Sequence, residues 1–215
     1  MTTTAQERDQ IALRAQLYRE HGAIAGMVVP KGTLPARFRP GAAEALVAQG
    51  ALRVYGTPDA EVQLLAVGAY QLGEALRAAR RLEARGTTAA VVYLLEPGRF
   101  RRPRDAREGS RAAPPELSRD LFPGDPVRVI LSHTRPEPML GLLRPLDTGR
   151  HRTRALGYAN RGGTLDTFGM LFANRCTWAH AVVEAAEALQ REPESFLSAE
   201  ELAAVLGQGD PRALA

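Results

Sequence analysis

The sequence predicts an α/β fold: a three-layer αβα sandwich around a mostly parallel five-stranded sheet with one antiparallel strand. The strongest observation is a βαβ unit between residues 61 and 96. Two largely apolar runs, residues 61–67 and 89–95, lack polar alternation, which is typical of parallel strands buried on both faces. Between them, leucine and alanine recur at helical spacing and arginines occupy the other positions. A right-handed crossover then places the two strands side by side.

Before this unit, the sequence predicts one short helix and one further strand. Residues 41–49 form the expected helix, which ends at Gly50, and residues 51–55 form the strand. Because a tight Gly-Thr-Pro-Asp turn leads from this strand to the next, it is the expected antiparallel member of the sheet. Residues 5–20 carry an irregular helical pattern further upstream.

After the βαβ unit, the chain first makes a long connection, residues 97–126, which is rich in arginine and has no apolar periodicity. Connections of this length inside a domain are often functional or partly disordered. Two further strands are predicted, at residues 127–131 and 153–157. Between them, residues 136–143 form a short helix that begins with proline.

The last part of the chain is predicted to be helical. One helix runs from about Thr167 to Gln190, with large apolar side chains on one side, and a second begins at Ser198, where Ser-Ala-Glu-Glu has the spacing of a capping box. No internal repeat is present. The expected division is an N-terminal helical or linker segment at 1–50, the α/β domain at 51–192 and a C-terminal helical tail at 193–215.

Composition restricts the class of protein. The formal net charge is +4, and Lys31 is the only lysine among 28 basic residues. This skew is typical of a bias toward arginine codons, so it weakens any argument for nucleic-acid binding from charge alone. No apolar run reaches the ~20 residues that span a bilayer, and residues 2–10 are too polar for a secretory signal. We therefore expect a cytoplasmic protein without a membrane segment.

The single cysteine, Cys176, excludes an internal disulfide. It falls inside the predicted helix 167–190, where a small core residue is the simplest interpretation. No spacing of His, Cys or carboxylate residues suggests a metal site.

Two stretches carry a family resemblance. Residues 62–79 consist of a strand, a glycine turn and a helix that begins E-A-x-x-A-A. Residues 157–180 follow the pattern G-Y-x-x-x-G-T-T-T-T-P-F-D-M-x-x-x-N-x-x-x-x-x-H closely. Together they resemble the C-terminal domain of transketolase-like thiamine-diphosphate enzymes, most closely the phosphoketolase branch. The positions that fit the second pattern are Gly157, Tyr158, Gly162, Thr164, Phe168, Met170, Asn174 and His180.

This chain departs from the phosphoketolase pattern at the threonine run, which is reduced to Gly-Thr-Leu-Asp-Thr at residues 163–167, and at Gly169, where the family has aspartate. These changes suggest a divergent branch, such as one that epimerises xylulose 5-phosphate. Upstream, residues 25–31 resemble the A-G-K-Q-P segment that closes the preceding pyrimidine-binding domain in phosphoketolases. The resemblance gives Lys31 a contact with the sugar phosphate.

The cofactor motif of thiamine-diphosphate enzymes is missing from this sequence. Those enzymes need G-D-G followed by an asparagine pair, whereas Gly124 and Gly209 are each followed by Asp-Pro. The resemblance therefore implies a C-terminal domain or small subunit of a sugar-phosphate enzyme in pentose phosphate metabolism. A large partner chain would supply thiamine diphosphate, Mg²⁺ and the catalytic residues, and this chain would bind no cofactor and be inactive alone. The alternatives are a non-catalytic oligomerisation domain or one that binds an anionic effector; a nucleic-acid binder is a third.

Candidate binding residues come from two places. His133 and Arg135 follow a strand at the carboxyl edge of the sheet, where α/β proteins usually bind ligands. Arg101 and Arg102 belong to the arginine-rich connection, which contacts a sugar phosphate or a partner, or else is a solvated loop. Lys31 suits phosphate as a compact cation. We assign no catalytic residue, and we expect His180 to be a hydrogen-bonded helix residue at the domain surface. We also expect self-association or association with the large chain.

Overall fold

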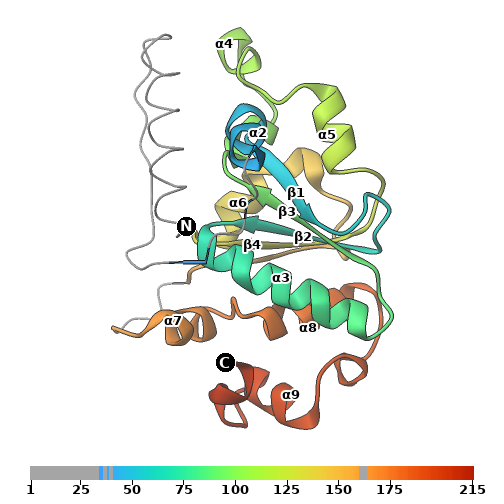
Figure 1. Ribbon diagram of the computed structural model, residues 1–215, viewed down its shortest axis with the longest axis vertical. Helices are drawn as coiled ribbons and strands as arrows, with labels where there is room; N and C mark the ends of the chain where they lie inside the picture. The colour runs from blue at the N-terminus through green and yellow to red at the C-terminus, as the bar shows by residue number, and fades with distance from the viewer. Residues whose placement is uncertain (1–33, 36–37, 39–40, 160–163) are drawn as a thin grey trace.

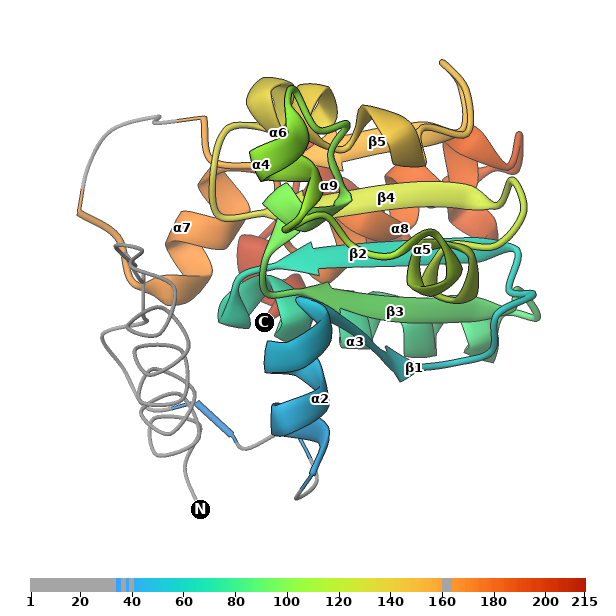
Figure 2. The ribbon, with the colours of Figure 1, turned by 90° about the horizontal axis from the view of Figure 1, so that it is seen from above.

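The computed structural model describes residues 34–35, 38, 41–159 and 164–215. It confirms the predicted α/β fold, with one five-stranded sheet in the order β1-β3-β2-β4-β5 (Figure 1; Figure 2). β1 is antiparallel to β3, and the other neighbouring pairs are parallel. The predicted antiparallel strand is thus confirmed, although it pairs with β3 rather than with the strand that follows it. The strands are β1 Ala51–Tyr55, β2 Val62–Val67, β3 Ala89–Leu94, β4 Val127–Ser132 and β5 Thr153–Leu156.

Helices form a layer on each side of the sheet. α3 and α8 pack on one face, and the shorter helices α5 and α6 cover the other (Figure 1). No helix in the described ranges is long and apolar enough to cross a bilayer. The helices are α2 Ala42–Gln49, α3 Ala69–Ala84, α4 Ala106–Gly109, α5 Pro115–Leu121, α6 Pro136–Leu142, α7 Thr167–Ala173, α8 Trp178–Ala188 and α9 Ala199–Val205. Short 3-10 turns are η1 Pro97–Phe100, η2 Arg144–Leu146, η3 Pro193–Ser195 and η4 Pro211–Leu214.

The two apolar runs of the βαβ unit are buried as predicted. All six residues of β2 are buried, because the strand lies at the centre of the sheet with helices over both faces. Alternate side chains point to opposite sides. Leu64 packs in the core beneath α3 and α8, whereas Leu65 belongs to the core on the other face.

The predicted single helix 167–190 is wrong, because the chain breaks between α7 and α8. Arg175 adopts a left-handed backbone with φ 56°, and Thr177 is extended before α8 begins. The Asn174 side chain donates from Nδ2 to the Met170 carbonyl (2.8 Å) where α7 ends. Cys176 lies in this break rather than in a helix, but it is buried as expected. Apolar periodicity missed the break because both halves are apolar.

The arginine-rich connection is more ordered than its sequence suggests, because it contains η1, α4 and α5. Phe100 and Phe122 are buried under the sheet and meet edge to face with ring centroids 5.3 Å apart. Leu121 joins the same core. Phe100 lies near the start of the connection and Leu121 and Phe122 lie together at its end, so they give no helical pattern across it, but they tie both ends of the connection to the sheet.

A buried arginine anchors the end of this connection. Arg128 of β4 is almost inaccessible, and its guanidinium donates to Gln63 Oε1 (2.9 Å) and to the carbonyls of Leu146 (2.6 Å) and Phe122 (3.0 Å). Gln63 in turn donates to the Leu121 carbonyl (2.7 Å). Burial lowers the pKa of Arg128 from its usual value. The network joins β2, β4 and the two segments that flank β4.

The C-terminal tail packs onto α3 and α8. The predicted capping box of Ser198 and Glu201 is present at the start of α9. Glu201 also accepts two hydrogen bonds from Arg81 of α3, at 2.6 and 2.7 Å. Trp178 Nε1 donates to the Leu214 carbonyl (2.9 Å), and Leu214 is completely buried in the same core.

Candidate functional site

A small hollow, the sheet-edge pocket, lies at the carboxyl ends of β2 and β4. It has a volume of about 290 Å³. Ligands of open α/β sheets usually bind at this edge. Its lining residues are Tyr70, Gln71, Ser132, His133, Tyr158, Leu165, Thr167, Met170, Leu171, Asn174 and Cys176.

One wall of the sheet-edge pocket is formed by the turns after β2 and β4. His133 is fixed there, because its backbone N–H donates to the Val67 carbonyl (3.1 Å) and its ring Nδ1 lies 2.9 Å from the same oxygen. Gly68 lies beside it with φ 116°. This backbone conformation strains any residue with a side chain, and a Cβ at Gly68 would also lie 3.0 Å from His133 Nδ1, so the turn favours glycine.

The opposite wall comes from the segment with the family pattern. Gly157 passes so close to the chain after β4 that a Cβ would lie 2.3 Å from the Thr134 carbonyl oxygen. Tyr158 N–H donates to that same carbonyl (2.9 Å). Asn174, which is 8% exposed, bridges the two sides of the segment, since Oδ1 accepts from Ala159 N–H (2.7 Å). These residues shape the wall and are held by backbone contacts.

Two titratable groups close to this pocket are unsuited to proton transfer or nucleophilic attack near neutral pH. His180 is buried, hydrogen-bonded through Nδ1 to Thr177 Oγ1 (2.7 Å), and burial lowers its pKa to about 4. Its predicted hydrogen bond is present, but it lies in the core rather than at the surface. Burial raises the pKa of Cys176 to about 12, so the thiol stays protonated.

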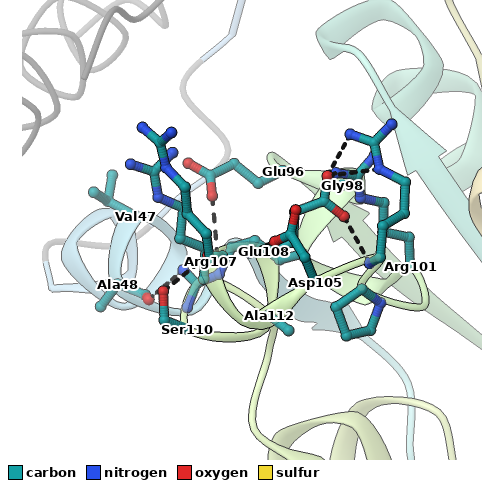
Figure 3. A pocket seen from close by; sticks show the side chains of 14 residues that line it. Val47, Ala48, Glu96, Gly98, Arg101, Asp105, Arg107, Glu108, Ser110 and Ala112 are labelled. Carbon is teal, nitrogen blue, oxygen red and sulfur yellow. Dashed lines mark hydrogen bonds and ion pairs between the residues drawn. The ribbon is translucent and has the colours of Figure 1, made fainter.

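A second and larger hollow, the arginine hollow, lies between α2 and the connection after β3. Its volume is about 1130 Å³ (Figure 3). Five arginines and three carboxylates line it. The lining residues are Val47, Ala48, Glu96, Gly98, Arg99, Arg101, Pro103, Arg104, Asp105, Arg107, Glu108, Ser110, Arg111 and Ala112.

Glu108 is the centre of the ion pairs in the arginine hollow. Its carboxylate accepts from Arg104 Nε (2.7 Å) and from the Arg104 backbone N–H (2.9 Å), and it pairs with Arg101 (2.5 Å). The hydrogen bonds from Arg104, followed by the charge of Arg101, lower the pKa of Glu108 to about 2. One carboxylate therefore contacts two guanidinium groups and offsets the charge of one of them.

The structure distributes the predicted binding residues over different places. His133 lines the sheet-edge pocket and Arg101 lines the arginine hollow. Arg135 lines neither; it is 71% exposed and lies 3.7 Å from Glu137. Arg102 is exposed and lines neither hollow. Lys31 falls outside the described residues.

The family-pattern residues are also spread over several environments. Tyr158, Met170 and Asn174 line the sheet-edge pocket. Phe168 packs against the core and Thr164 is exposed. Gly162 falls outside the described residues.

Sequence reasoning did not find Arg128, which holds the end of the arginine-rich connection. A signal was present, because the second residue of β2 and the second residue of β4 are polar within otherwise largely apolar runs. These residues, Gln63 and Arg128, are paired in the register of β2 and β4. Two polar residues at matching positions of buried strands indicate a hydrogen bond between neighbours.

No family model matches the sequence, and no curated protein matches it. Among solved structures, the transketolase of Leishmania mexicana superposes with a TM-score of 0.51 at 16% identity, over 71% of this chain and 20% of that chain. The transketolase of Pichia stipitis in complex with sedoheptulose 7-phosphate gives a TM-score of 0.54 at 16% identity, over 78% of this chain and 22% of that chain. The chain thus spans about a fifth of the length of these transketolases and has the fold of the transketolase C-terminal domain.

The described residues do not form a site for a divalent metal such as Mg²⁺. No group of three His, Cys, Asp or Glu side chains gathers among them, and the sheet-edge pocket has no carboxylate in its lining. In the arginine hollow, Glu108 and Glu96 pair with arginines, and Asp105 accepts from the Glu108 backbone N–H (2.8 Å). Oxygen ligands for Mg²⁺ are therefore not gathered in this part of the chain.

Proposed function

We propose that this chain is the C-terminal domain or small subunit of a transketolase-like enzyme of sugar-phosphate metabolism. A partner chain supplies thiamine diphosphate, Mg²⁺ and the catalytic residues. The observation that carries the proposal is the fold of the transketolase C-terminal domain, present in a chain that spans about a fifth of the length of the transketolases it superposes on.

The geometry of the family-pattern segment supports the proposal. Gly157 and Asn174 match the phosphoketolase pattern, and each has a structural reason to be the residue it is. Gly157 has no room for a Cβ, and Asn174 uses both ends of its amide to join Ala159 and Met170. Asn174 lines the sheet-edge pocket and Gly157 lies next to Tyr158, which also lines it, so their agreement with the pattern supports the proposal.

In this proposal, the chain contributes to the reaction by binding and positioning the substrate. The cofactor supplies the carbanion chemistry when it is bound to the partner. His133 is the only imidazole or carboxyl group among the residues that line the sheet-edge pocket, and its Nδ1 is held at the Val67 carbonyl, which leaves Nε2 to contact a substrate. The lining residues contribute binding and orientation to the assembly.

The test begins with a tagged chain purified from its source cells at low salt. We expect a large co-purifying chain with G-D-G followed by an asparagine pair. The two chains are then assayed separately and together with xylulose 5-phosphate, thiamine diphosphate and Mg²⁺. We expect turnover only from the mixture. Turnover by this chain alone would overturn the proposal, and a partner that is fully active without it would favour the alternative of a non-catalytic oligomerisation or effector domain.

The same assay distinguishes three possible reactions of the complex. We propose the phosphoketolase branch, for which turnover by the complex should require inorganic phosphate. A requirement for a second sugar phosphate instead would indicate a transketolase, and interconversion of xylulose 5-phosphate without either would indicate the epimerase-like branch. Light scattering of this chain alone at high micromolar concentration tests the expected self-association.

A further inference from the structure

The arginine hollow combines a large concave surface with more positive than negative side chains. Five arginines face three carboxylates, which leaves two positive charges in excess. Typical small-molecule pockets enclose ~300–1000 Å³, so a hollow of about 1130 Å³ accepts a phosphorylated metabolite. Which arginines carry this excess charge depends on which of them are already paired with a carboxylate.

Each carboxylate of the hollow already has a partner. Glu108 is shared by Arg101 and Arg104, and Glu96 lies 3.9 Å from Arg99 Nε. Asp105 caps α4 by accepting the Glu108 backbone N–H. The charge of Asp105 acts on Arg104, so Glu108 and Asp105 offset Arg101 and Arg104, while Glu96 offsets Arg99.

Arg107 and Arg111 supply the excess charge. Both line the hollow and both are exposed, and no carboxylate in the described ranges pairs with either. A guanidinium presents several N–H donors in one plane and matches two oxygens of a phosphate group. We propose that the arginine hollow binds a phosphorylated small molecule, with Arg107 and Arg111 contacting its phosphate.

The framework of the hollow is built before any ligand arrives. Arg99 donates from Nη1 to the Ala48 carbonyl (2.6 Å), which joins η1 to α2 across the floor. Ala113 N–H donates to the Arg99 carbonyl (2.8 Å) and closes the other end. A preformed site avoids much of the ordering cost of binding.

The lining also indicates the kind of ligand. Val47 and Ala48 of α2 line the hollow on the side away from Asp105 and Arg101, and Ala48 is exposed, so an organic group has a small apolar surface beside the charged side chains (Figure 3). No aromatic side chain lines the hollow. Single-stranded nucleic acid usually stacks its bases on such side chains, so the chemistry favours a small phosphorylated molecule over RNA or DNA.

The experiment measures binding of pyrophosphate to the full chain without partner, thiamine diphosphate or Mg²⁺. Calorimetry and the shift in melting temperature are compared with sodium chloride at matched ionic strength. The test variant is Arg107→Gln with Arg111→Gln. The matched control is Arg102→Gln with Arg119→Gln, which removes the same charge from exposed arginines of the same connection that do not line the hollow.

We expect pyrophosphate to raise the melting temperature of the unmodified chain and of the control more than chloride does. The test variant should bind at least about tenfold more weakly, since two charge-assisted contacts are lost. Fructose 6-phosphate and a single-stranded oligonucleotide are measured in parallel. Equal loss in both variants, an equal shift with chloride, no binding at all, or stronger binding of the oligonucleotide would overturn the proposal. Because the measurement uses this chain alone, it is independent of the proposed enzymatic role.

Discussion

Two long connections leave the carboxyl edge of the sheet, and different interactions stabilise them. The first, residues 95–126 between β3 and β4, buries Phe100 and Phe122 and ends on the network of Arg128. The second, residues 157–177 between β5 and α8, contains α7, in which no residue is fully buried. Each connection lines one of the two hollows.

The comparison shows that the number of charged residues in a connection does not decide whether the connection is well ordered. The first connection is the more highly charged one, yet a few buried groups tie it to the sheet. The second is largely apolar around α7, but its shape depends on backbone contacts of Gly157 and on the amide of Asn174. The arginine hollow should therefore be the more rigid of the two hollows. The shape of the sheet-edge pocket should be the more easily altered by a single substitution.

The largest effect is expected from Arg128→Met. The substitution leaves the carbonyls of Phe122 and Leu146 and the amide of Gln63 without their donor in a buried site. Each unsatisfied buried group costs ~1–3 kcal/mol, so the free energy of unfolding should fall by about 4 kcal/mol. Urea unfolding measures it. The exposed control Arg102→Met should change stability by less than ~0.5 kcal/mol, and equal stability of the two variants would refute the anchoring role.

The next largest effect is a loss of folding stability when the pH is lowered. The pKa of His180 is about 4 in the folded chain, against an ordinary value of 6.5, so the unfolded chain binds an extra proton between these values. Stability from this group is complete above pH 6.5 and is lost as the pH falls to 4, by about 3 kcal/mol. Chemical unfolding from pH 7 to pH 4 measures the loss.

The matched variant His180→Asn isolates this contribution. Burial raises the pKa of Glu184, which works in the opposite direction because a folded carboxyl with a raised pKa gains stability as the pH falls. The difference between the two pH profiles removes that contribution. Parallel profiles for the variant and the unmodified chain would contradict the prediction.

A smaller and more local effect is expected from Asn174→Ala. It removes the hydrogen bonds to Ala159 and Met170, which should cost about 2 kcal/mol. Hydrogen exchange should speed up in residues 157–177 and stay unchanged in residues 95–126. Asn174→Asp keeps the acceptor for Ala159 and should lose about half as much. Faster exchange in both connections would mean that they are coupled.

The smallest effect on stability is expected from Arg104→Gln, because its ion pair with Glu108 is exposed to solvent and screened. The urea midpoint should not change measurably. The carboxyl titration of Glu108, followed by NMR, should move up from about 2, since Arg104 is the main cause of that low pKa. The stabilisation by Glu108 is present above its unfolded pKa and fades as the pH falls toward 2. An unchanged titration would show that Arg101 and the backbone N–H of residue 104 hold the carboxylate without the Arg104 side chain.

The sequence by itself determined the parallel pairing of β2 and β3, the antiparallel strand β1 and the capping box of α9. The crossover and the capping box depend on residues close together in the chain, whereas the antiparallel direction of β1 was inferred from the turn before β2, although its partner is β3. Uninterrupted apolar runs indicate strands that are buried on both faces, and the spacing of Ser198 and Glu201 indicates the start of a helix. The match of residues 157–180 to a family pattern could also be read directly, and so could the candidacy of His133 at a strand end.

Only the tertiary structure decided the break between α7 and α8, the anchoring role of Arg128 and the separation of the predicted binding residues into two hollows. Asn174 bonds to Ala159, 15 residues away, and Arg128 bonds to carbonyls on three different segments. Periodicity records which side of an element is buried, but it carries no information about which distant carbonyl a polar side chain will meet. The same limit applies to the arginines, because their sequence spacing does not show which of them share a carboxylate and which are left to bind an anion.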